Sequence, residues 1–233
     1  MKNRKALLCT VLTLLFAYNI HAQEASDIIK QSAAKYDGMK VYMDSGKVVS
    51  SFYNLARPHS TALLFKTAYA NNGSFNFEYY QLGSTDINVL NRDAEKQVKV
   101  WQGFSNRLIS GQPLKLAMAG FVGISSFTVA LVPTLLMAEE KLMPRTIFDQ
   151  IAGPKVAATE MVSGVECYKI VESKPLPIAT WVVWISKSDF MIRKAEIDRK
   201  VNDFNVRATY TYFPYTSADP SIFAFKPNRK VSL

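Results

Sequence analysis

The sequence predicts a mainly β (α+β) protein: a strongly bent antiparallel sheet or incomplete β-barrel, with an N-terminal helix and a central apolar helical insertion acting as a lid or plug. Three observations indicate this class. Segments that alternate apolar and polar residues recur along the chain, and turn signals such as Asn71-Asn72-Gly73 separate them. Residues 116–138 form one charge-free run of 23 positions in the middle of the chain. With 233 residues, 48% of them hydrophobic, the chain can bury a large core.

The N-terminus has the pattern of a secretory signal peptide. Lys2, Arg4 and Lys5 form a positive region, and the apolar residues 6–17 follow. The apolar stretch is shorter than a membrane-spanning helix, which disfavours the alternative of an N-terminal anchor. We therefore expect residues 1–22 to be removed and residues 23–233 to form a single domain.

The composition of the mature chain indicates an exported protein that has no internal disulfide. Removing residues 1–22 takes away three of the 28 basic residues and no acidic one, so the net charge becomes 25 − 19 = +6. Cys167 and His59 are then the only cysteine and histidine, and one cysteine cannot form an internal disulfide. These features predict the periplasm of a Gram-negative bacterium.

A helix and several strands are expected before the apolar run. Ser26 or Asp27 can cap a helix that runs to about Tyr36 and ends at Asp37-Gly38. Strands are expected over residues 47–55, 61–70, 75–79, 87–90 and 97–103.

The chain is expected to return to strands after the apolar run. Residues 204–212 alternate strictly, so Phe204, Val206, Ala208, Tyr210 and Tyr212 share one face, as in a strand with one face in water. The other strands are expected over residues 155–161, 166–172, 180–186 and 191–200, with a short last strand holding Phe223 and Phe225.

The apolar run is expected to fold as helices inside the β domain. Helical pieces are predicted over residues 113–125, 128–141 with a bend at Pro133, and 145–151. The run is long enough to span a membrane. Strands of the same kind lie on both sides of it, however, and a membrane span would divide one sheet between two compartments.

The run can be plain core or the wall of a ligand cavity, and both readings stay open on the residues alone. It is apolar on nearly every side, so more than one of its faces must be covered. The cavity reading gives nine candidate lining residues, six from the run and three from the sheet: Phe121, Ile124, Phe127, Leu131, Leu135, Met137, Trp101, Phe75 and Phe77.

Residues for catalysis are scarce. A nucleophilic triad would need His59, which follows Arg57-Pro58 in an expected turn, and Cys167 is expected to be an inert buried thiol. The sequence has no paired-cysteine or HExxH metal motif and no phosphate-binding glycine loop. We therefore predict a protein that is not an enzyme, with no cofactor, no metal and no nucleic-acid partner.

The C-terminal part resembles a known family. Trp184-Ile185 precedes Asp189, Ile192-Arg193-Lys194 and a hairpin follow, and Phe223-Ala224-Phe225-Lys226-Pro227 closes the pattern. In these features the chain resembles the LolA-like superfamily of periplasmic lipoprotein carriers and outer-membrane lipoprotein-sorting proteins. The resemblance implies an incomplete barrel closed by helices that holds acyl chains. It also implies an arginine that latches the lid, for which Arg57 is the candidate.

The functional prediction is a non-catalytic periplasmic carrier. It would be a monomer that binds a lipid or lipoprotein acyl chain between sheet and helical lid, with membrane-associated donor and acceptor proteins as possible partners. The alternative is an interaction or sensor module of the same fold whose core is plugged and which transports no ligand. A hydrolase that depends on His59 is a third reading.

Overall fold

The computed structural model describes residues 24–140, 142, 145–173, 179–217 and 219–231. Their strands form one antiparallel sheet of eleven strands in the order β6-β5-β4-β3-β2-β1-β11-β10-β9-β8-β7. The predicted signal peptide, residues 1–22, lies outside the described residues. The first six strands are β1 (Val41–Tyr53), β2 (His59–Ala70), β3 (Phe75–Gln81), β4 (Asn88–Arg92), β5 (Val98–Gln102) and β6 (Arg107–Ser110). The last five are β7 (Pro154–Val162), β8 (Val165–Glu172), β9 (Ala179–Ser186), β10 (Ile192–Val201) and β11 (Phe204–Tyr215).

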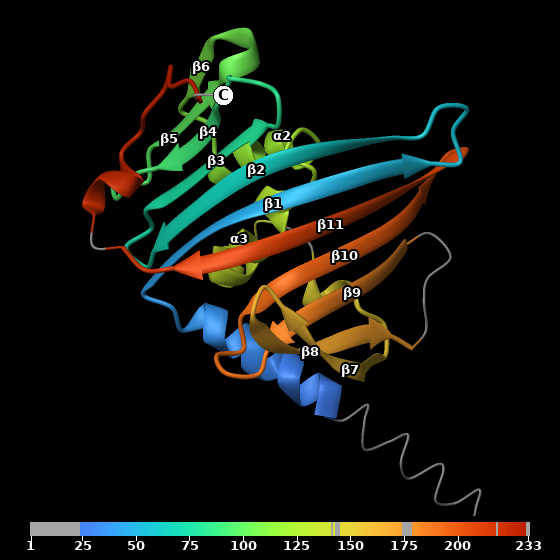
Figure 1. Cartoon of the computed structure of the whole chain (residues 1–233). Coiled ribbons are helices and arrows are strands. Elements are labelled where there is room, and N and C mark those ends of the chain that lie inside the picture. Colours follow the sequence, from blue (N-terminus) through green and yellow to red (C-terminus); the bar gives the residue numbers. More distant parts are fainter. Residues whose placement is uncertain (1–23, 141, 143–144, 174–178, 218, 232–233) are drawn as a thin grey trace, which may run out of the picture.

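The sheet is bent but its two edge strands do not meet. β1 to β6 form one meander and β7 to β11 another, and β1 pairs with β11 where the two meanders join, with Val48 opposite Tyr210. Figure 1 shows the long strands β1, β2, β10 and β11 in the centre of the curved sheet and the shorter strands at both ends. The predicted class, an incomplete barrel of antiparallel strands with helical elements, is confirmed.

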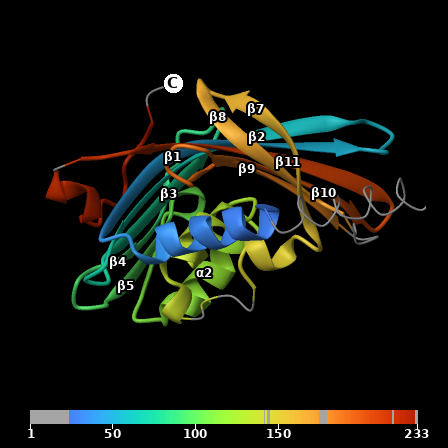
Figure 2. The same ribbon diagram turned by 90° about the horizontal axis from the view of Figure 1, so that it is seen from below.

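One face of the sheet is concave and apolar. Along β11, the side chains of Val206, Ala208, Tyr210 and Tyr212 are buried, while Arg207 between them is exposed, as the alternation predicts. Figure 2 shows the helices gathered under this concave face and the C-terminal segment on the opposite, convex side. The concave face is therefore the place where a ligand could be enclosed.

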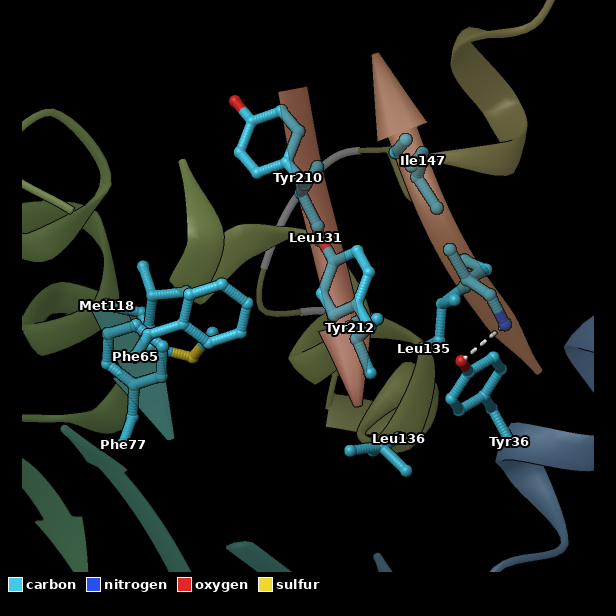
Figure 3. Packing of buried hydrophobic residues seen from close by; sticks show 14 of the residues in the cluster. Tyr36, Phe65, Phe77, Met118, Leu131, Leu135, Leu136, Ile147, Tyr210 and Tyr212 are labelled. Carbon is cyan, nitrogen blue, oxygen red and sulfur yellow. Dashed lines mark hydrogen bonds between the residues drawn. The ribbon is translucent and has the colours of Figure 1, made fainter. Parts of the chain in front are cut away.

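The N-terminal helix, residues 24–37, covers part of the concave face. Ala25, Ile28, Ser32 and Tyr36 are buried, which is the spacing of one helical face. The hydroxyl of Tyr36 accepts a hydrogen bond of 3.0 Å from the backbone N–H of Ile192. Figure 3 shows this contact as a dashed line. The helix is thus fixed to β10 by packing and by a buried hydrogen bond.

A carboxyl group lies buried on the concave side of β1. Asp44 accepts hydrogen bonds from the hydroxyl of Tyr42 (2.8 Å) and the backbone N–H of Thr67 (3.1 Å). Burial raises the pKa of Asp44 to about 6, and these hydrogen bonds only partly oppose it. Among the described residues, no ion pair includes Asp44. Its charged form therefore opposes folding.

The central insertion is a series of short helices. They are α2 (Leu114–Val122), η2 (Thr128–Ala130), α3 (Val132–Leu136), η3 (Ala138–Glu140) and η4 (Phe148–Gln150). Within the described part of the chain, every helix is too short or too polar to cross a membrane. The 116–138 run instead packs on the concave face, where Leu131, Leu135 and Leu136 lie among tyrosines of β11 and phenylalanines of β2 and β3 (Figure 3).

The insertion departs from its predicted form because its backbone is interrupted. The helix expected over residues 128–141 is divided into η2, α3 and η3, and the piece expected over 145–151 is reduced to η4. Thr134 Oγ1 donates to the carbonyl oxygens of Ala130 and Leu131, both at 2.9 Å. This side-chain bonding, together with Pro133 at the start of α3, favours short turns over one continuous helix.

Two strand predictions also need correction. The last strand expected at Phe223 and Phe225 does not form: residues 220–223 are a 3₁₀ turn, η5 (Pro220–Phe223), and only a single bridge from Asp86 to Lys230 follows. Pro220 can begin such a turn, and the Asp219 side chain caps it by accepting from the Ser221 N–H at 2.8 Å. Conversely, β6 at the sheet edge was not anticipated from the sequence.

Candidate functional site

The candidate site is organised by the turn that follows α2. Ser126 and Phe127 both adopt left-handed backbone conformations, with φ of 51° and 67°. Such conformations are costly for residues with a side chain. The turn is held by the Tyr210 hydroxyl, which donates to the Ser126 carbonyl oxygen at 2.9 Å, and by the Phe127 N–H, which donates to the Val122 carbonyl oxygen at 2.8 Å. The sheet thus fixes the Phe127 side chain in one place.

Phe127 faces an arginine of the concave face. The guanidinium carbon of Arg199 on β10 lies 4.5 Å from the centre of the Phe127 ring, which is a cation–π contact. Burial raises the pKa of the Tyr210 hydroxyl, and the nearby Arg199 charge opposes that rise. Arg199, Phe127 and Tyr210 therefore lie together where the insertion meets the sheet.

A hollow of about 540 Å³ opens beside Phe127, between the insertion and strands β9 and β10. We call it the Trp181 hollow. Its volume lies in the range of small-molecule binding sites. Apolar walls come from the insertion, the 145–150 segment and the sheet: Phe127, Ala130, Leu131, Ile147, Ala179, Trp181, Ile197 and Val201. The remaining lining residues are Arg145, Thr146, Gln150, Arg199, Lys200 and Asn202.

A second hollow, of about 440 Å³, lies on the other side of the same turn. We call it the Ile124 hollow. Ile124 and Ser126 line it from the insertion, and Leu63 and Tyr79 line it from the concave face. The only charged residue in its lining is Asp86, which forms an ion pair with Lys230. The turn therefore separates a hollow with several cations from one without a cation.

A third hollow, of about 530 Å³, lies on the convex side of β1, β2 and β3. We call it the Lys66 hollow. Lys47, Lys66 and Arg229 line it, with Leu64 and Phe213 among its apolar residues. It is separate from the insertion, so a ligand bound there would not lie between sheet and helices.

The predicted lining residues divide into four groups. Phe127 and Leu131 line the Trp181 hollow, and Ile124, which is 43% exposed, lines the Ile124 hollow. Trp101 lies apart from both: it is packed with Ile87 and Val89 in a small cluster under the C-terminal segment. The rest are packed into the main core, at most 4% exposed: Phe75, Phe77, Phe121, Leu135 and Met137.

An ion pair joins Arg92 of the sheet to the insertion, and the predicted latch, Arg57, lies elsewhere. Arg57 is exposed in the turn between β1 and β2. On β4, the Nη1 of buried Arg92 donates to both carboxylate oxygens of Glu140 of η3, at 2.7 and 2.6 Å. Its Nε donates to the Gly73 carbonyl oxygen at 2.6 Å. Glu140 is partly exposed, so the pair lies at the edge of the core.

His59 and Cys167, the side chains weighed for nucleophilic chemistry, are far apart in the sheet. His59 is exposed at the start of β2 and stacks on the ring of Phe52, 4.7 Å between centroids. Cys167 is buried on β8, with β1, β11, β10 and β9 between it and β2. Burial raises the pKa of the Cys167 thiol to about 11, so the thiolate is disfavoured at neutral pH. These two residues cannot form a nucleophile–base pair.

Sequence reasoning missed Trp181, Ile197 and Arg199. Both strands that supply them were predicted, and the signal was present in the alternation along β10, where Ala195, Ile197, Arg199 and Val201 share a face. Arg199 interrupts that otherwise apolar face.

Comparisons with known proteins add structural neighbours only. No family model and no curated protein matches the chain. Among solved structures, lipoprotein LppX from Mycobacterium tuberculosis is similar over 83% of this chain and 97% of that one, at 12% identity and a TM-score of 0.45. A LolA superfamily protein from Nitrosomonas europaea is similar over 87% of this chain and 97% of that one, at 9% sequence identity and a TM-score of 0.34.

A complex of two proteins is also among these neighbours. The match to the MucA/MucB complex of Pseudomonas aeruginosa covers 87% of this chain at 9% identity and a TM-score of 0.46. It spans only 61% of the matched chain.

Proposed function

We propose that the chain is an exported, non-catalytic lipid-binding protein. It holds an acyl chain in the Trp181 hollow, between β9, β10 and the insertion. The observation that carries the proposal is the apolar lining contributed by both walls of that hollow, with Trp181 and Ile197 on the sheet side and Phe127 and Leu131 on the insertion side. The signal-peptide pattern of residues 1–22 supports a periplasmic location.

The energetics are adequate for reversible binding. Each buried methylene contributes about 0.8 kcal/mol, so about ten methylenes contribute ~8 kcal/mol. That free energy corresponds to a Kd of roughly 1 µM. Such an affinity would allow a carrier to release its lipid to an acceptor. Opening between sheet and insertion would admit longer chains, and this movement would break the contacts of Phe127 and Arg92 described above.

Trp181 makes a site-specific test possible. The chain has three tryptophans, and Trp101 and Trp184 are packed in separate small clusters outside the main core. Only Trp181 lines the hollow. A fatty acid brominated near the middle of its chain quenches indole fluorescence by contact. We expect it to quench the wild-type protein and the Trp184→Phe variant, and to lose most of this effect in Trp181→Phe.

Trp184→Phe is the matched control because Trp184 lies on the same strand as Trp181 but points to the opposite face of the sheet. Absence of quenching in all three proteins would contradict lipid binding. Quenching that survives Trp181→Phe would place the lipid elsewhere, for example near Trp101, and would contradict the proposed site.

The plugged module remains the second candidate function, since much of the insertion is tightly packed. Phe121, Leu135 and Met137 are all buried in the main core. If native mass spectrometry of protein purified without detergent shows no bound lipid, and none binds after incubation, the plugged module is favoured instead.

A further inference from the structure

The lining of the Trp181 hollow is cationic as well as apolar. Arg145, Arg199 and Lys200 belong to it, and no acidic residue does. Among the ion pairs that the described residues form, none includes any of these three side chains. Within the described part of the chain, the cations that line the hollow therefore have no ion-pair partner.

Arg199 is the most constrained of the three. It is half-buried on the concave face, and its guanidinium contacts the Phe127 ring rather than a carboxylate. Arginine stays charged at any physiological pH, and its planar group suits bidentate bonding to a phosphate or carboxylate. A partly desolvated guanidinium with an aromatic ring on one side still has donors free for an anion.

The acidic side chain of the 145–150 segment, Asp149, is already engaged. Asp149 of η4 accepts hydrogen bonds from the Thr146 N–H and hydroxyl, at 2.8 and 2.9 Å. Its carboxylate caps that turn and is not part of the lining. The Ile124 hollow, on the other side of the same turn, has no cation in its lining. The charge is thus specific to the side of the turn on which Trp181 lies.

From this arrangement we infer that the ligand is an amphiphile with an anionic headgroup, phosphate or carboxylate, which Arg199 and Arg145 recognise while the acyl chain contacts Trp181 and Ile197. This inference rests on the proposed function and adds the headgroup class to it. A neutral lipid of the same chain length would bind through the apolar walls alone, and a zwitterionic one would gain less from the arginines because its own cation opposes them. The headgroup contacts should favour the anionic lipid on the order of tenfold in Kd.

The test compares two lipids that share one acyl chain, lysophosphatidylglycerol and lysophosphatidylcholine. Their Kd values are measured by displacement of a fluorescent acyl probe, at low and at high salt. We expect the wild type to prefer lysophosphatidylglycerol about tenfold at low salt and less at high salt, because salt screens the partly exposed charges. Glycerol phosphate, which has the headgroup without the chain, should not displace the probe at comparable concentrations.

Three variants make the assignment specific. Arg199→Gln should reduce the preference toward one, weakening lysophosphatidylglycerol more than lysophosphatidylcholine, and Arg199→Lys should retain most of the preference. Lys66→Gln makes the same charge change in the Lys66 hollow, on the convex face, and should leave the preference unchanged. A preference that survives Arg199→Gln, or that Lys66→Gln abolishes, would overturn the inference.

The two proposals fail in different ways. If both lipids bind the wild type equally, the headgroup inference is wrong while lipid binding stands. If neither lipid displaces the probe, or the probe itself does not bind, the proposed function is wrong and the inference falls with it.

Discussion

Replacing the buried carboxyl of Asp44 should change how stability depends on pH. In the unfolded chain this group has an ordinary pKa of 3.8, and burial in the fold raises it to about 6. At about 1.4 kcal/mol per pKa unit, the difference corresponds to ~3 kcal/mol. Because the folded-state pKa is the higher one, the folded protein takes up the proton first as the pH falls. The free energy of unfolding should therefore rise as the pH falls from about 7 to about 4.

The Asp44→Asn variant removes this titration and can keep both hydrogen bonds. The amide oxygen can accept from the Thr67 N–H, and the amide nitrogen can donate to the Tyr42 hydroxyl. We expect the variant to be more stable than the wild type by up to ~3 kcal/mol above pH 7, with the difference shrinking toward zero near pH 4.

Urea unfolding followed by circular dichroism, at several pH values, measures this difference. Asp203→Asn in the exposed β10–β11 turn is the control, because it removes the same charge without burial. A pH-dependent gain in Asp44→Asn that Asp203→Asn does not share is the expected result. A difference between wild type and Asp44→Asn that is constant over this pH range would refute the assignment of a raised pKa to Asp44.

Three further changes test the packing of the insertion. Arg92→Met removes the pair with Glu140 and the hydrogen bond to the Gly73 carbonyl. In urea titrations it should lower the free energy of unfolding by about 2–4 kcal/mol. A loss below about 1 kcal/mol would show that the pair is dispensable. Ser126→Gly relieves a left-handed residue, so thermal unfolding should show a gain of ~1 kcal/mol, and a loss would contradict the strain. Leu135→Ala should cost about 3 kcal/mol of stability, yet change acyl-probe affinity less than twofold if the Trp181 hollow is the site.

Alternation along a single strand predicted which of its faces is buried, because period-two patterning depends only on neighbouring residues. Residues 204–212 show this, because the predicted apolar face is the face that lies buried against the insertion. The division of residues 116–138 into core and hollow wall was not predictable. It depends on where the helix breaks, and that is set by the turn at Ser126 and Phe127, which the Tyr210 hydroxyl of β11 holds in place.

Trp101 shows a second limit of sequence reasoning. Its strand was predicted, but a large aromatic residue gives no indication of which face of a sheet it occupies. Val98 and Val100 join the main core, so Trp101 points to the convex side. There the C-terminal segment covers it, with Phe225 and Val231 packed against its cluster. Phe225, one of the residues that cover it, belongs to the segment predicted as the last strand.

The pairing of β1 with β11 has a consequence for how the protein matures. Each meander can form from hairpins between neighbours in sequence, whereas Val48 and Tyr210 must close a loop of more than 160 residues before they pair. Such distant contacts slow folding. The emerging chain therefore has its β1 edge and apolar insertion exposed until β11 arrives. A chaperone that shields that edge until β11 is made would raise the yield of folded protein.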